Sequence, residues 1–386
     1  MARRRLPRFV FDYVEGGAED ESALARNAAA LARLRLRPRV LRDVSCRSQA
    51  VRLLGQELPS PLLVAPTGLN GLVRRDGDVA LARAAAAHGL PFVLSSAATT
   101  RLEEVAERAG GDLWFQLYVL SARHFAESLM ARARAAGYRV LVLTVDVPVS
   151  GARERDQRNG FRMPFRLTPS LALDACRRPA WCLDFLRGGM PELANLKSEG
   201  AGDLEAQAAL LARQMDTSLA WESLAWVRDH WPGRVLLKGV LDPEDADRAM
   251  AAGLDGVIVS NHGGRQLDAA PATIEALPGV VAAVAGRGAV LVDSGFRRGA
   301  DVLKAVALGA DAVLLGRATL YGLAAAGEAG AAAVIALLKA EIDRNLALLG
   351  CASLGELGPD RVSGDPPAGA SGPGAPSPAT TGELRG

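Results

Sequence analysis

The chain has 386 residues, of which 49% are hydrophobic and 23% are charged, a composition typical of a folded globular protein rather than a disordered, collagenous or coiled-coil chain. Its 45 basic and 43 acidic residues leave a net charge of only +2, so it lacks the basic field that attracts nucleic acid, and no nucleic-acid partner is expected. The length allows two or three domains, or one large α/β barrel with insertions.

The N-terminus carries several arginines in residues 1–11 but no apolar core, so it does not resemble a secretory signal. No apolar run reaches the roughly 18 residues that span a bilayer. The closest candidate, near 324–338, contains Glu328 and is typical of an alanine-rich helix. The four cysteines form no Cys-x-x-Cys pair and no Cys/His cluster, so no metal site is predicted and a reducing, cytoplasmic compartment fits best.

Short apolar runs recur along the chain, and each is typical of a strand buried on both faces. They are 62–64, 92–94, 113–117, 140–145, 235–237, 257–259, 290–292 and 313–315. Segments rich in alanine and arginine with helical spacing lie between most of them, at 79–88, 102–108, 121–136, 221–230, 243–252 and 300–308. Strand and helix therefore alternate.

Glycines mark the predicted helix ends. Gly89, Gly137, Gly253 and Gly309 each follow a helical segment and precede a strand, the position where a left-handed glycine closes a helix. Asp242-Pro243 forms an N-cap followed by proline in the first turn. Eight buried strands with crossover helices favour a (β/α)8 barrel over an open doubly wound sheet.

Three regions lie outside this alternation. The first is an N-terminal extension up to about residue 60, and the second is a long insertion at 150–220, after the fourth strand. The third is the segment 358–386, which is rich in Pro, Gly, Ala and Ser and is predicted to be a disordered tail. We therefore expect residues 1–357 to form a single domain.

The most informative motif runs from Ser260 to Asp268, with the sequence Ser-Asn-His-Gly-Gly-Arg-Gln-Leu-Asp. His262 sits just past a strand, glycines let the backbone approach a ligand, and Arg265 is suited to a bidentate grip on a carboxylate. The alternative is a capped turn with a hydrogen-bonded histidine. Asp146, at the end of the fourth strand, is a candidate partner that would raise the basicity of His262, although such an aspartate can also cap a helix.

Two glycine- and arginine-rich segments follow the seventh and eighth strands, at 293–299 and at Gly316-Arg317. Backbone amides, a helix N-terminus and arginines there predict a phosphate cradle, and the alternative is a solvated basic helix start. Lys238 ends the fifth strand, where a cation could stabilise negative charge on a cofactor ring; a surface lysine is the alternative. No Gly-x-Gly-x-x-Gly follows an early strand, so a nicotinamide site is not indicated.

These motifs, over roughly residues 5–355, resemble the FMN-dependent α-hydroxy-acid dehydrogenase and oxidase family. The matching stretches are S-N-H-G-G-R-Q-L-D, D-S-G-F-R-R-G, A-P-T-G, W-F-Q-L-Y and L-T-V-D. The resemblance implies a (β/α)8 barrel with FMN at its mouth and oxidation of a 2-hydroxy acid to the 2-oxo acid. His262, oriented by Asp146, would be the active-site base, accepting either the α-proton or the hydroxyl proton.

The resemblance also implies how substrate and cofactor are held. Arg153 and Arg265 would bind the substrate carboxylate, and Tyr13 and Tyr118 would contact the carboxylate and the hydroxyl. The residues implied to bind FMN are Pro66, Thr67, Gly68, Ser95, Gln116 and Thr144 around the ring and ribityl chain, Lys238 and Ser260 near the ring edge, and Asp293, Gly295, Arg297, Gly316 and Arg317 around the ribityl chain and phosphate.

Small residues near the substrate point to one branch of this family. Ala97 occupies a place where relatives acting on short hydroxy acids often carry tryptophan, and Ser150 and Gly68 are also small. The resemblance therefore implies a phenyl-sized substrate, with (S)-mandelate oxidised to phenylglyoxylate (benzoylformate). The alternatives are L-lactate or another (S)-2-hydroxy acid and, from a different class, an FMN-dependent prenyl diphosphate isomerase, which would have no use for Arg153 and Arg265.

Residues 166–200 mix apolar and basic side chains in a way that suits an interfacial membrane segment. The resemblance implies peripheral contact with the inner face of the cytoplasmic membrane, a quinone or another component of the electron-transfer chain as acceptor, and a homotetramer. The alternative is a loop packed on the barrel or on a neighbouring subunit. Only twelve residues precede Tyr13, so the helix that opens the family is expected to be shortened or absent.

Overall fold

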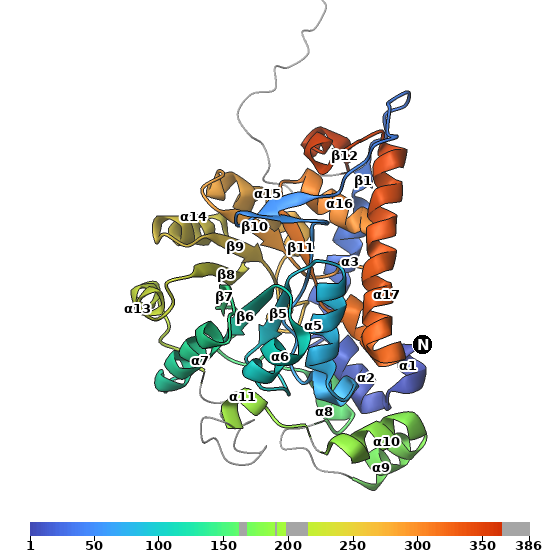
Figure 1. Ribbon diagram of the computed structural model, residues 1–386, viewed down its shortest axis with the longest axis vertical. Helices are drawn as coiled ribbons and strands as arrows, with labels where there is room; N and C mark the ends of the chain where they lie inside the picture. Colours follow the sequence, from blue (N-terminus) through green and yellow to red (C-terminus); the bar gives the residue numbers. More distant parts are fainter. Residues whose placement is uncertain (162–167, 190, 198–214, 365–386) are drawn as a thin grey trace, which may run out of the picture.

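The computed structural model describes residues 1–161, 168–189, 191–197 and 215–364 (Figure 1). Its centre is a closed barrel of parallel strands in the order β10-β11-β4-β5-β6-β7-β8-β9. The strands are β4 (Leu62–Val64), β5 (Phe92–Ser95), β6 (Leu113–Leu117), β7 (Val140–Thr144), β8 (Arg234–Val240), β9 (Gly256–Val259), β10 (Ala289–Val292) and β11 (Ala312–Leu315). The predicted (β/α)8 barrel is confirmed, with all eight strands at the expected places.

The strands are buried on both faces because alternate side chains serve two different cores. In β4, for example, Leu63 points into the barrel, whereas Leu62 and Val64 pack among the surrounding helices. The barrel interior is filled by side chains from all eight strands: Leu63, Ala65, Val93, Trp114, Val140, Val142, Leu236, Ile258, Leu291, Ala312 and Leu314. A filled interior leaves the ends of the barrel as the places where a ligand can bind.

Helices cover the outside of the barrel. They are α5 (Gly77–Ala87), α6 (Leu102–Ala109), α7 (His124–Ala135), α13 (Ser223–His230), α14 (Pro243–Ala251), α15 (Thr273–Val284), α16 (Gly299–Ala307) and α17 (Arg317–Leu349). The glycines predicted to close four of them all have positive φ, between 67° and 99°. The Asp242 side chain accepts the Glu244 N–H, as predicted for an N-cap.

Within the described residues, α17 is the helix long and apolar enough to cross a membrane. It runs along the barrel beside α5 and α16 (orange in Figure 1), and its buried face includes Leu323, Ile335 and Leu338. Its backbone leaves the helical conformation at Ala326 and Gly327. We interpret α17 as the helix that completes the barrel, in agreement with the helix predicted from its sequence.

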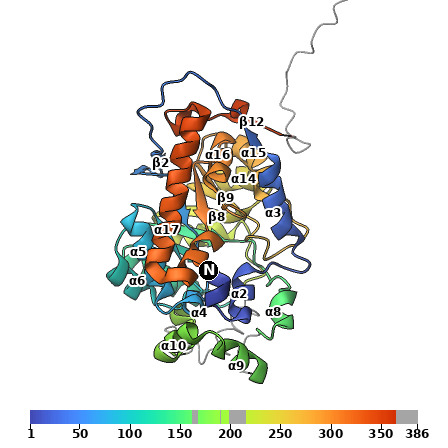
Figure 2. The ribbon, with the colours of Figure 1, turned by 90° about the vertical axis from the view of Figure 1, so that its right-hand side faces the viewer.

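The N-terminal extension closes both ends of the barrel. The hairpin of β2 (Val51–Leu53) and β3 (Gln56–Leu58) inserts Leu53 and Leu58 into the interior core at one end. At the other end lie α1 (Ala2–Arg5) and α2 (Arg8–Glu15), near α4 (Asn70–Val73) and α8 (Glu154–Arg158) (Figure 2). The chain then continues into α3 (Ser22–Arg33). Two short helices, α1 of four residues and α2 of eight, therefore precede α3.

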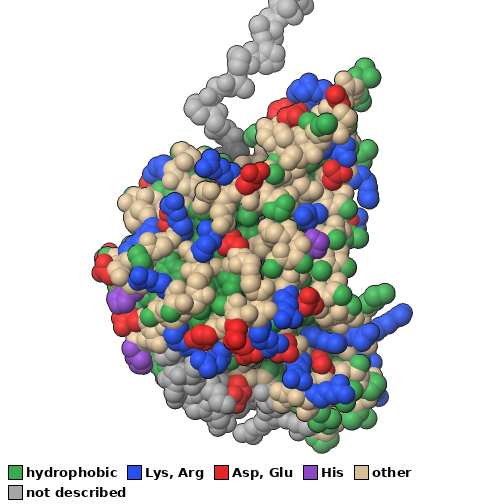
Figure 3. Space-filling view, viewed as in Figure 1, with side chains coloured by type: hydrophobic (Ala, Val, Ile, Leu, Met, Phe, Trp, Pro, Cys, Tyr) green, Lys and Arg blue, Asp and Glu red, His purple; other side chains and the backbone are tan. Residues whose placement is uncertain are grey.

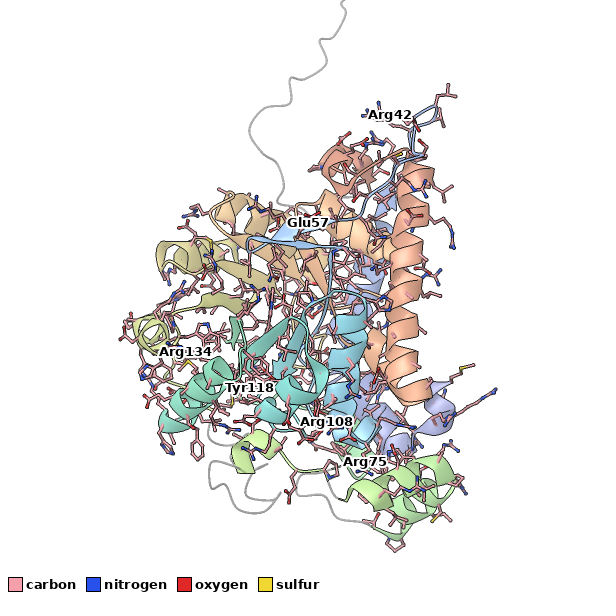
Figure 4. The ribbon with its side chains drawn as sticks, in the orientation of Figure 1. Arg42, Glu57, Arg75, Arg108, Tyr118 and Arg134 are labelled. Atoms are coloured by element: carbon pink, nitrogen blue, oxygen red, sulfur yellow. The ribbon has the colours of Figure 1, made fainter. Side chains whose placement is uncertain are left out.

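The insertion after β7 forms α8, α9 (Pro169–Cys176), α10 (Pro179–Gly188) and α11 (Ala194–Lys197), all at the end of the barrel that carries α2 (Figure 1). Helix α10 is tied to the barrel, because Trp181 Nε1 donates to the Leu72 carbonyl at 2.7 Å and the Arg75 N–H donates to Asp184 at 3.1 Å. Figure 4 labels Arg75 between the barrel helices and α10. One face of α10 is thereby fixed against the protein.

The predicted start of the disordered tail at residue 358 is wrong. After the 3-10 turn Leu354–Glu356, residues Pro359–Arg361 form another 3-10 turn, and β12 (Val362–Ser363) pairs antiparallel with β1 (Arg35–Leu36). Arg361 is only 4% exposed, and its guanidinium donates to the Leu349 carbonyl. These long-range contacts order a segment whose composition suggested disorder. The rest of the predicted tail, 365–386, lies outside the described residues.

Candidate active site

A cavity of about 320 Å³ opens at the C-terminal ends of the barrel strands. Many of the residues predicted from sequence line it: Tyr13, Pro66, Thr67, Gly68, Ser95, Tyr118, Arg153, Lys238, His262, Arg265, Asp293, Gly295, Arg297, Gly316 and Arg317. Ala97 and Ser150, expected near the substrate, line it as well. The fold thus brings together side chains that are up to about 300 positions apart in the sequence.

The other predicted site residues lie directly behind the cavity wall. Gln116 accepts a hydrogen bond from Ser95 at 3.0 Å and donates one to Thr144 at 3.0 Å. The strands hold this row in register, since Ser95 pairs with Gln116 and Thr144 with Lys238 across neighbouring strands. The Ser260 hydroxyl accepts a hydrogen bond from Lys238 Nζ at 2.8 Å. These buried side chains orient the polar groups that face the cavity.

His262 and Asp146 form a hydrogen-bonded pair. Nδ1 of His262 lies 3.0 Å from Oδ1 of Asp146, and the His262 N–H donates to the Ser260 hydroxyl at 3.0 Å. Burial alone would raise the pKa of Asp146, but His262 and Lys238 outweigh it and the net pKa is lowered. Burial lowers the pKa of His262, although Asp146 opposes the shift. At neutral pH the carboxylate is therefore ionised and the imidazole neutral.

This charge state decides the tautomer of His262. An ionised carboxylate only accepts hydrogen bonds, so Nδ1 carries the proton and Nε2 is a hydrogen-bond acceptor. The Tyr118 hydroxyl lies 3.3 Å from Nε2, and burial raises the pKa of Tyr118, which keeps the phenol protonated. Figure 4 labels Tyr118 near the end of β6. His262 thus presents a basic nitrogen to the cavity.

Lys238 is a buried cation, only 3% exposed. Its Nζ lies 3.3 Å from the Asp293 carboxylate. Burial alone would lower the pKa of Lys238. The carboxylates of Asp293 and Asp146 outweigh this effect, and the net pKa is above the usual value. The next residue, Gly239, has φ +105°, and a Cβ there would lie 2.5 Å from the Asp146 Cβ. Glycine at position 239 therefore permits the bulge in β8. The bulge allows the backbone after Lys238 to lie close to Asp146.

Two arginines are held by the C-terminal end of α2. Arg265 Nη1 donates to the carbonyls of Tyr13 and Gly16, at 2.7 and 2.8 Å. Arg317 donates to the carbonyls of Val14 and Gly16, at 2.9 and 2.8 Å. The helix end carries partial negative charge, which favours cations there. Burial lowers the pKa of Arg265 to about 9 and that of Arg317 to about 10, so both remain protonated at neutral pH.

None of the arginines at the cavity, Arg153, Arg265, Arg297 and Arg317, forms an ion pair with a carboxylate in the part of the chain that the structure describes. Partly buried cations without anionic partners are costly, so a site of this kind is suited to anions. The four arginines come from different segments. Arg153 lies after β7 and Arg265 after β9, whereas Arg297 and Arg317 follow β10 and β11.

The segments after β10 and β11 fit a phosphate group. Gly316 is the N-cap of α17 and has no side-chain hydrogen bond at that cap. A Cβ on Gly316 would meet only the Ala65 Cβ, at 4.0 Å, so the backbone there is open to a ligand. Gly295 has φ +94°, and Arg297 lies over the Tyr321 ring at 5.2 Å. A helix N-terminus, exposed backbone and two arginines make an anion site.

Several residues that line the cavity were not among the predicted site residues. Phe161, Leu193 and Met215 all line the cavity and are at most 8% exposed. They come from the insertion, which is pinned back onto the barrel: the Ala194 N–H donates to the Ala98 carbonyl at 3.1 Å, and the Asp216 N–H to the Val119 carbonyl at 3.0 Å. Of the three, only Leu193 lies in the predicted membrane segment 166–200, and no local sequence pattern marked Phe161 or Met215 as cavity residues.

Comparison with known proteins decides the family. Residues 2–364 match the protein family described as FMN-dependent dehydrogenase. The chain belongs to this family. It is 52% identical over 365 residues to the (S)-mandelate dehydrogenase of Pseudomonas putida, covering 95% of this chain and 92% of the relative. It is 46% identical to the L-lactate dehydrogenase of Pseudomonas aeruginosa strain UCBPP-PA14, covering 94% and 95%.

Solved structures agree with this assignment. The crystal structure of the monotopic membrane protein (S)-mandelate dehydrogenase superimposes with a TM-score of 0.91 at 52% identity, covering 94% of this chain and 97% of that one. Mandelate oxidase with (S)-4-hydroxymandelic acid gives a TM-score of 0.82 at 40% identity, covering 94% and 96%. The cofactor of this FMN-dependent dehydrogenase is therefore FMN, and the anion site after β10 and β11 fits its phosphate.

Proposed function

We propose that this enzyme, which oxidises a 2-hydroxy acid with FMN, acts on (S)-mandelate and forms phenylglyoxylate. The observation that carries the proposal is that two small residues, Ala97 and Ser150, line the same cavity as His262. Phe161, Leu193 and Met215 extend the apolar wall and would surround a phenyl ring. The two relatives that are named for mandelate support the same substrate.

The cofactor would be held along one side of the cavity. Gly316, Arg297 and Arg317 would bind the phosphate, and Ser95, backed by Gln116 and Thr144, would bind the polar part of the ring system. Lys238 would lie at the ring edge, where its fixed charge stabilises negative charge. When bound, FMN supplies the acceptor for the two electrons removed from the substrate.

The residues of the chain would supply binding and proton transfer. Arg153 and Arg265 would hold the substrate carboxylate, and the Tyr118 hydroxyl would lie beside the reacting hydroxyl group. Nε2 of His262 would accept the proton that leaves the substrate, because Nδ1 is already protonated and bound to Asp146. The ionised Asp146 would then stabilise the imidazolium that forms.

Anaerobic reduction of the bound flavin tests this proposal. (S)-Mandelate, (R)-mandelate, L-lactate and glycolate would be mixed in parallel with the holoenzyme, and loss of flavin absorbance followed. We expect (S)-mandelate to bleach the flavin fastest and (R)-mandelate to leave it oxidised. Faster bleaching by L-lactate would instead support the second candidate, which the lactate dehydrogenase relatives favour. The family assignment and the two arginines favour oxidation over diphosphate isomerisation.

We also propose contact with the membrane through the hairpin of α9 and α10. Leu173, Leu183 and Leu186 are 60%, 49% and 79% exposed, and Arg177 and Arg187 are exposed beside them. Figure 3 shows apolar and basic side chains together on this lower surface. A relative of 52% identity is described as a monotopic membrane protein. Parts of the predicted segment 166–200 lie outside the described residues.

The hairpin lies at the end of the barrel that carries α2, and Tyr13 of α2 lines the cavity. A membrane-dissolved quinone is therefore the electron acceptor that we propose, on the inner face of the cytoplasmic membrane. We further propose a homotetramer, the assembly implied by the family resemblance, which light scattering of the purified protein would test.

A further inference from the structure

Two buried side-chain atoms lack a hydrogen-bond partner in the described residues, and they lie close together in the sequence. They are Nε of Arg153 and Oδ1 of Asp156. Unsatisfied buried polar atoms are rare in proteins, because leaving a buried donor or acceptor without a partner is costly. Both belong to the start of α8, where Arg153 is the N-cap and Asp156 lies in the first turn. These two atoms therefore mark a place where a change on ligand binding could supply the missing hydrogen bonds.

Arg153 and Asp156 differ in whether they contact the cavity. Arg153 lines it, whereas Asp156 does not and is only 6% exposed. The charged groups that act on Asp156 are Arg153 and Arg155 from α8, Arg265 from the segment after β9, and Asp12 from α2. Asp156 is thus a buried carboxylate beside the two arginines that face the substrate.

Most of these neighbours are already engaged. Arg155 pairs with Glu21, and Asp12 accepts hydrogen bonds from Asn159 and Arg8. Arg265 donates through Nη1 to backbone carbonyls. Arg153 is the neighbour of Asp156 that keeps a buried donor without a partner. An arginine can use its Nε–H for one partner and its terminal nitrogens for another.

We propose that Asp156 is a positioning residue for the substrate carboxylate. When a carboxylate enters the cavity, Nε of Arg153 donates to Oδ1 of Asp156, and the terminal nitrogens of Arg153 hold the substrate. Both unsatisfied atoms then gain a partner in one step, and the planar guanidinium is held in one orientation. This inference rests on the proposed function, in which Arg153 binds the carboxylate of a 2-hydroxy acid.

The pairing predicts a pH dependence of binding. Burial raises the pKa of Asp156 to about 6, although Arg265 and Arg153 lower it. Pairing with Arg153 favours the ionised carboxylate, so a carboxylate ligand binds more weakly as the pH falls through this range. Simple repulsion between Asp156 and the ligand would have the opposite effect. Protonation of His262 would also strengthen binding at low pH, so the two causes differ in sign.

Binding of phenylacetate tests the inference without turnover, because phenylacetate has the carboxylate but no α-hydroxyl group. Calorimetric titration of the holoenzyme is expected to give a Kd about threefold higher near pH 5.5 than near pH 7.5. Asp156→Asn should raise the Kd about tenfold near pH 7.5 and abolish the rise toward low pH. Glu154→Gln removes an exposed carboxylate of the same helix and should leave both values unchanged.

The kinetics of (S)-mandelate oxidation separate positioning from chemistry. Asp156→Asn should raise KM about tenfold with kcat within about twofold, and Asp156→Glu should restore part of the loss. If Asp156→Asn does not fold, Arg153→Lys takes its place, since lysine keeps the charge but lacks the Nε donor. Unchanged phenylacetate binding in the variant tested, or a pH dependence of Kd that is the same in the wild type and in Asp156→Asn, would overturn the inference. If phenylacetate binds as expected but (S)-mandelate is not oxidised, the result would contradict the proposed substrate and leave the role of Asp156 supported.

Discussion

Arg265 and Tyr13 are 252 residues apart in the sequence and meet over the cavity. The guanidinium carbon lies 5.0 Å from the centre of the Tyr13 ring, and Nη1 donates to the Tyr13 carbonyl at 2.7 Å. The Gly16 carbonyl accepts from Arg265 and also from Arg317. Helix α2 therefore helps to build the cavity, because the carbonyls at its C-terminal end hold two of the arginines that line it.

Substitution of Arg265 is expected to impair substrate binding and turnover. Arg265→Met removes a buried cation from the carboxylate site and leaves the Tyr13 and Gly16 carbonyls without a donor. We expect kcat/KM for (S)-mandelate to fall by two to four orders of magnitude, or about 3–5 kcal/mol. Steady-state kinetics measure this effect, with the exposed Arg287→Met as control. A rate equal to that of the control would contradict the assigned role.

The pH dependence of turnover should follow His262. The base must be neutral, and burial lowers its pKa below the usual 6.5, so kcat/KM should stay high at pH 6.5 and fall only at lower pH. Asp146→Asn removes the negative charge that fixes the tautomer of His262 and stabilises the imidazolium, and should lower kcat by roughly 10³- to 10⁴-fold. Stopped-flow flavin reduction across pH measures both effects. An acid limb centred above 6.5 would be inconsistent with a buried, neutral His262.

Loss of the Lys238 cation should destabilise the protein. Lys238→Met leaves Asp293 and Asp146 buried beside an apolar side chain, which costs about 3–5 kcal/mol for a broken buried pair. We expect a lower free energy of unfolding in urea and weaker retention of FMN. Lys339→Met, on α17 and away from the cavity, is the matched control. If both variants unfold at the same urea concentration, the buried pair contributes no net stability.

The space around Ala97 should decide the preferred side chain of the substrate. A Cβ on Gly68 would lie 3.1 Å from the Ala97 Cβ, so this wall has little room to yield. Ala97→Trp should therefore reduce kcat/KM for (S)-mandelate by about 10- to 200-fold while affecting L-lactate much less. The ratio of the two substrates is the measurement. A ratio that does not move would place the phenyl ring elsewhere in the cavity.

The exposed leucines of α10 should control membrane binding. Leu183→Glu with Leu186→Glu replaces apolar side chains with charges on the exposed face of the helix, and we expect the protein to lose most of its binding to vesicles of phosphatidylglycerol and phosphatidylethanolamine. Leu348→Glu is the control, because Leu348 is 67% exposed on α17. Co-sedimentation measures binding. Equal sedimentation of the double variant and the control would refute this contact.

The sequence by itself determined the barrel and the chemistry at its strand ends. Strand burial, helix spacing and C-terminal glycines are local patterns, and eight repeats of one unit leave few possible topologies. Because parallel strands end at the same edge, His262, Asp146 and Lys238 could be placed together before the structure was known. The motif around His262 carried the resemblance to the family, and comparison with known proteins then confirmed it.

Only the tertiary structure decided which segments outside the repeat complete the site. Packing between segments that are distant in the sequence produces three features of the site. They are the α2 carbonyls that hold Arg265 and Arg317, the apolar wall of Phe161, Leu193 and Met215, and the burial of the unsatisfied atoms of Arg153 and Asp156. Such contacts have no sequence period. The ordered residues 358–364 show the same limit, since their composition favours disorder and a strand pairing with Arg35–Leu36 overrides it. Local patterns specify elements, whereas long-range packing specifies how they close around a ligand.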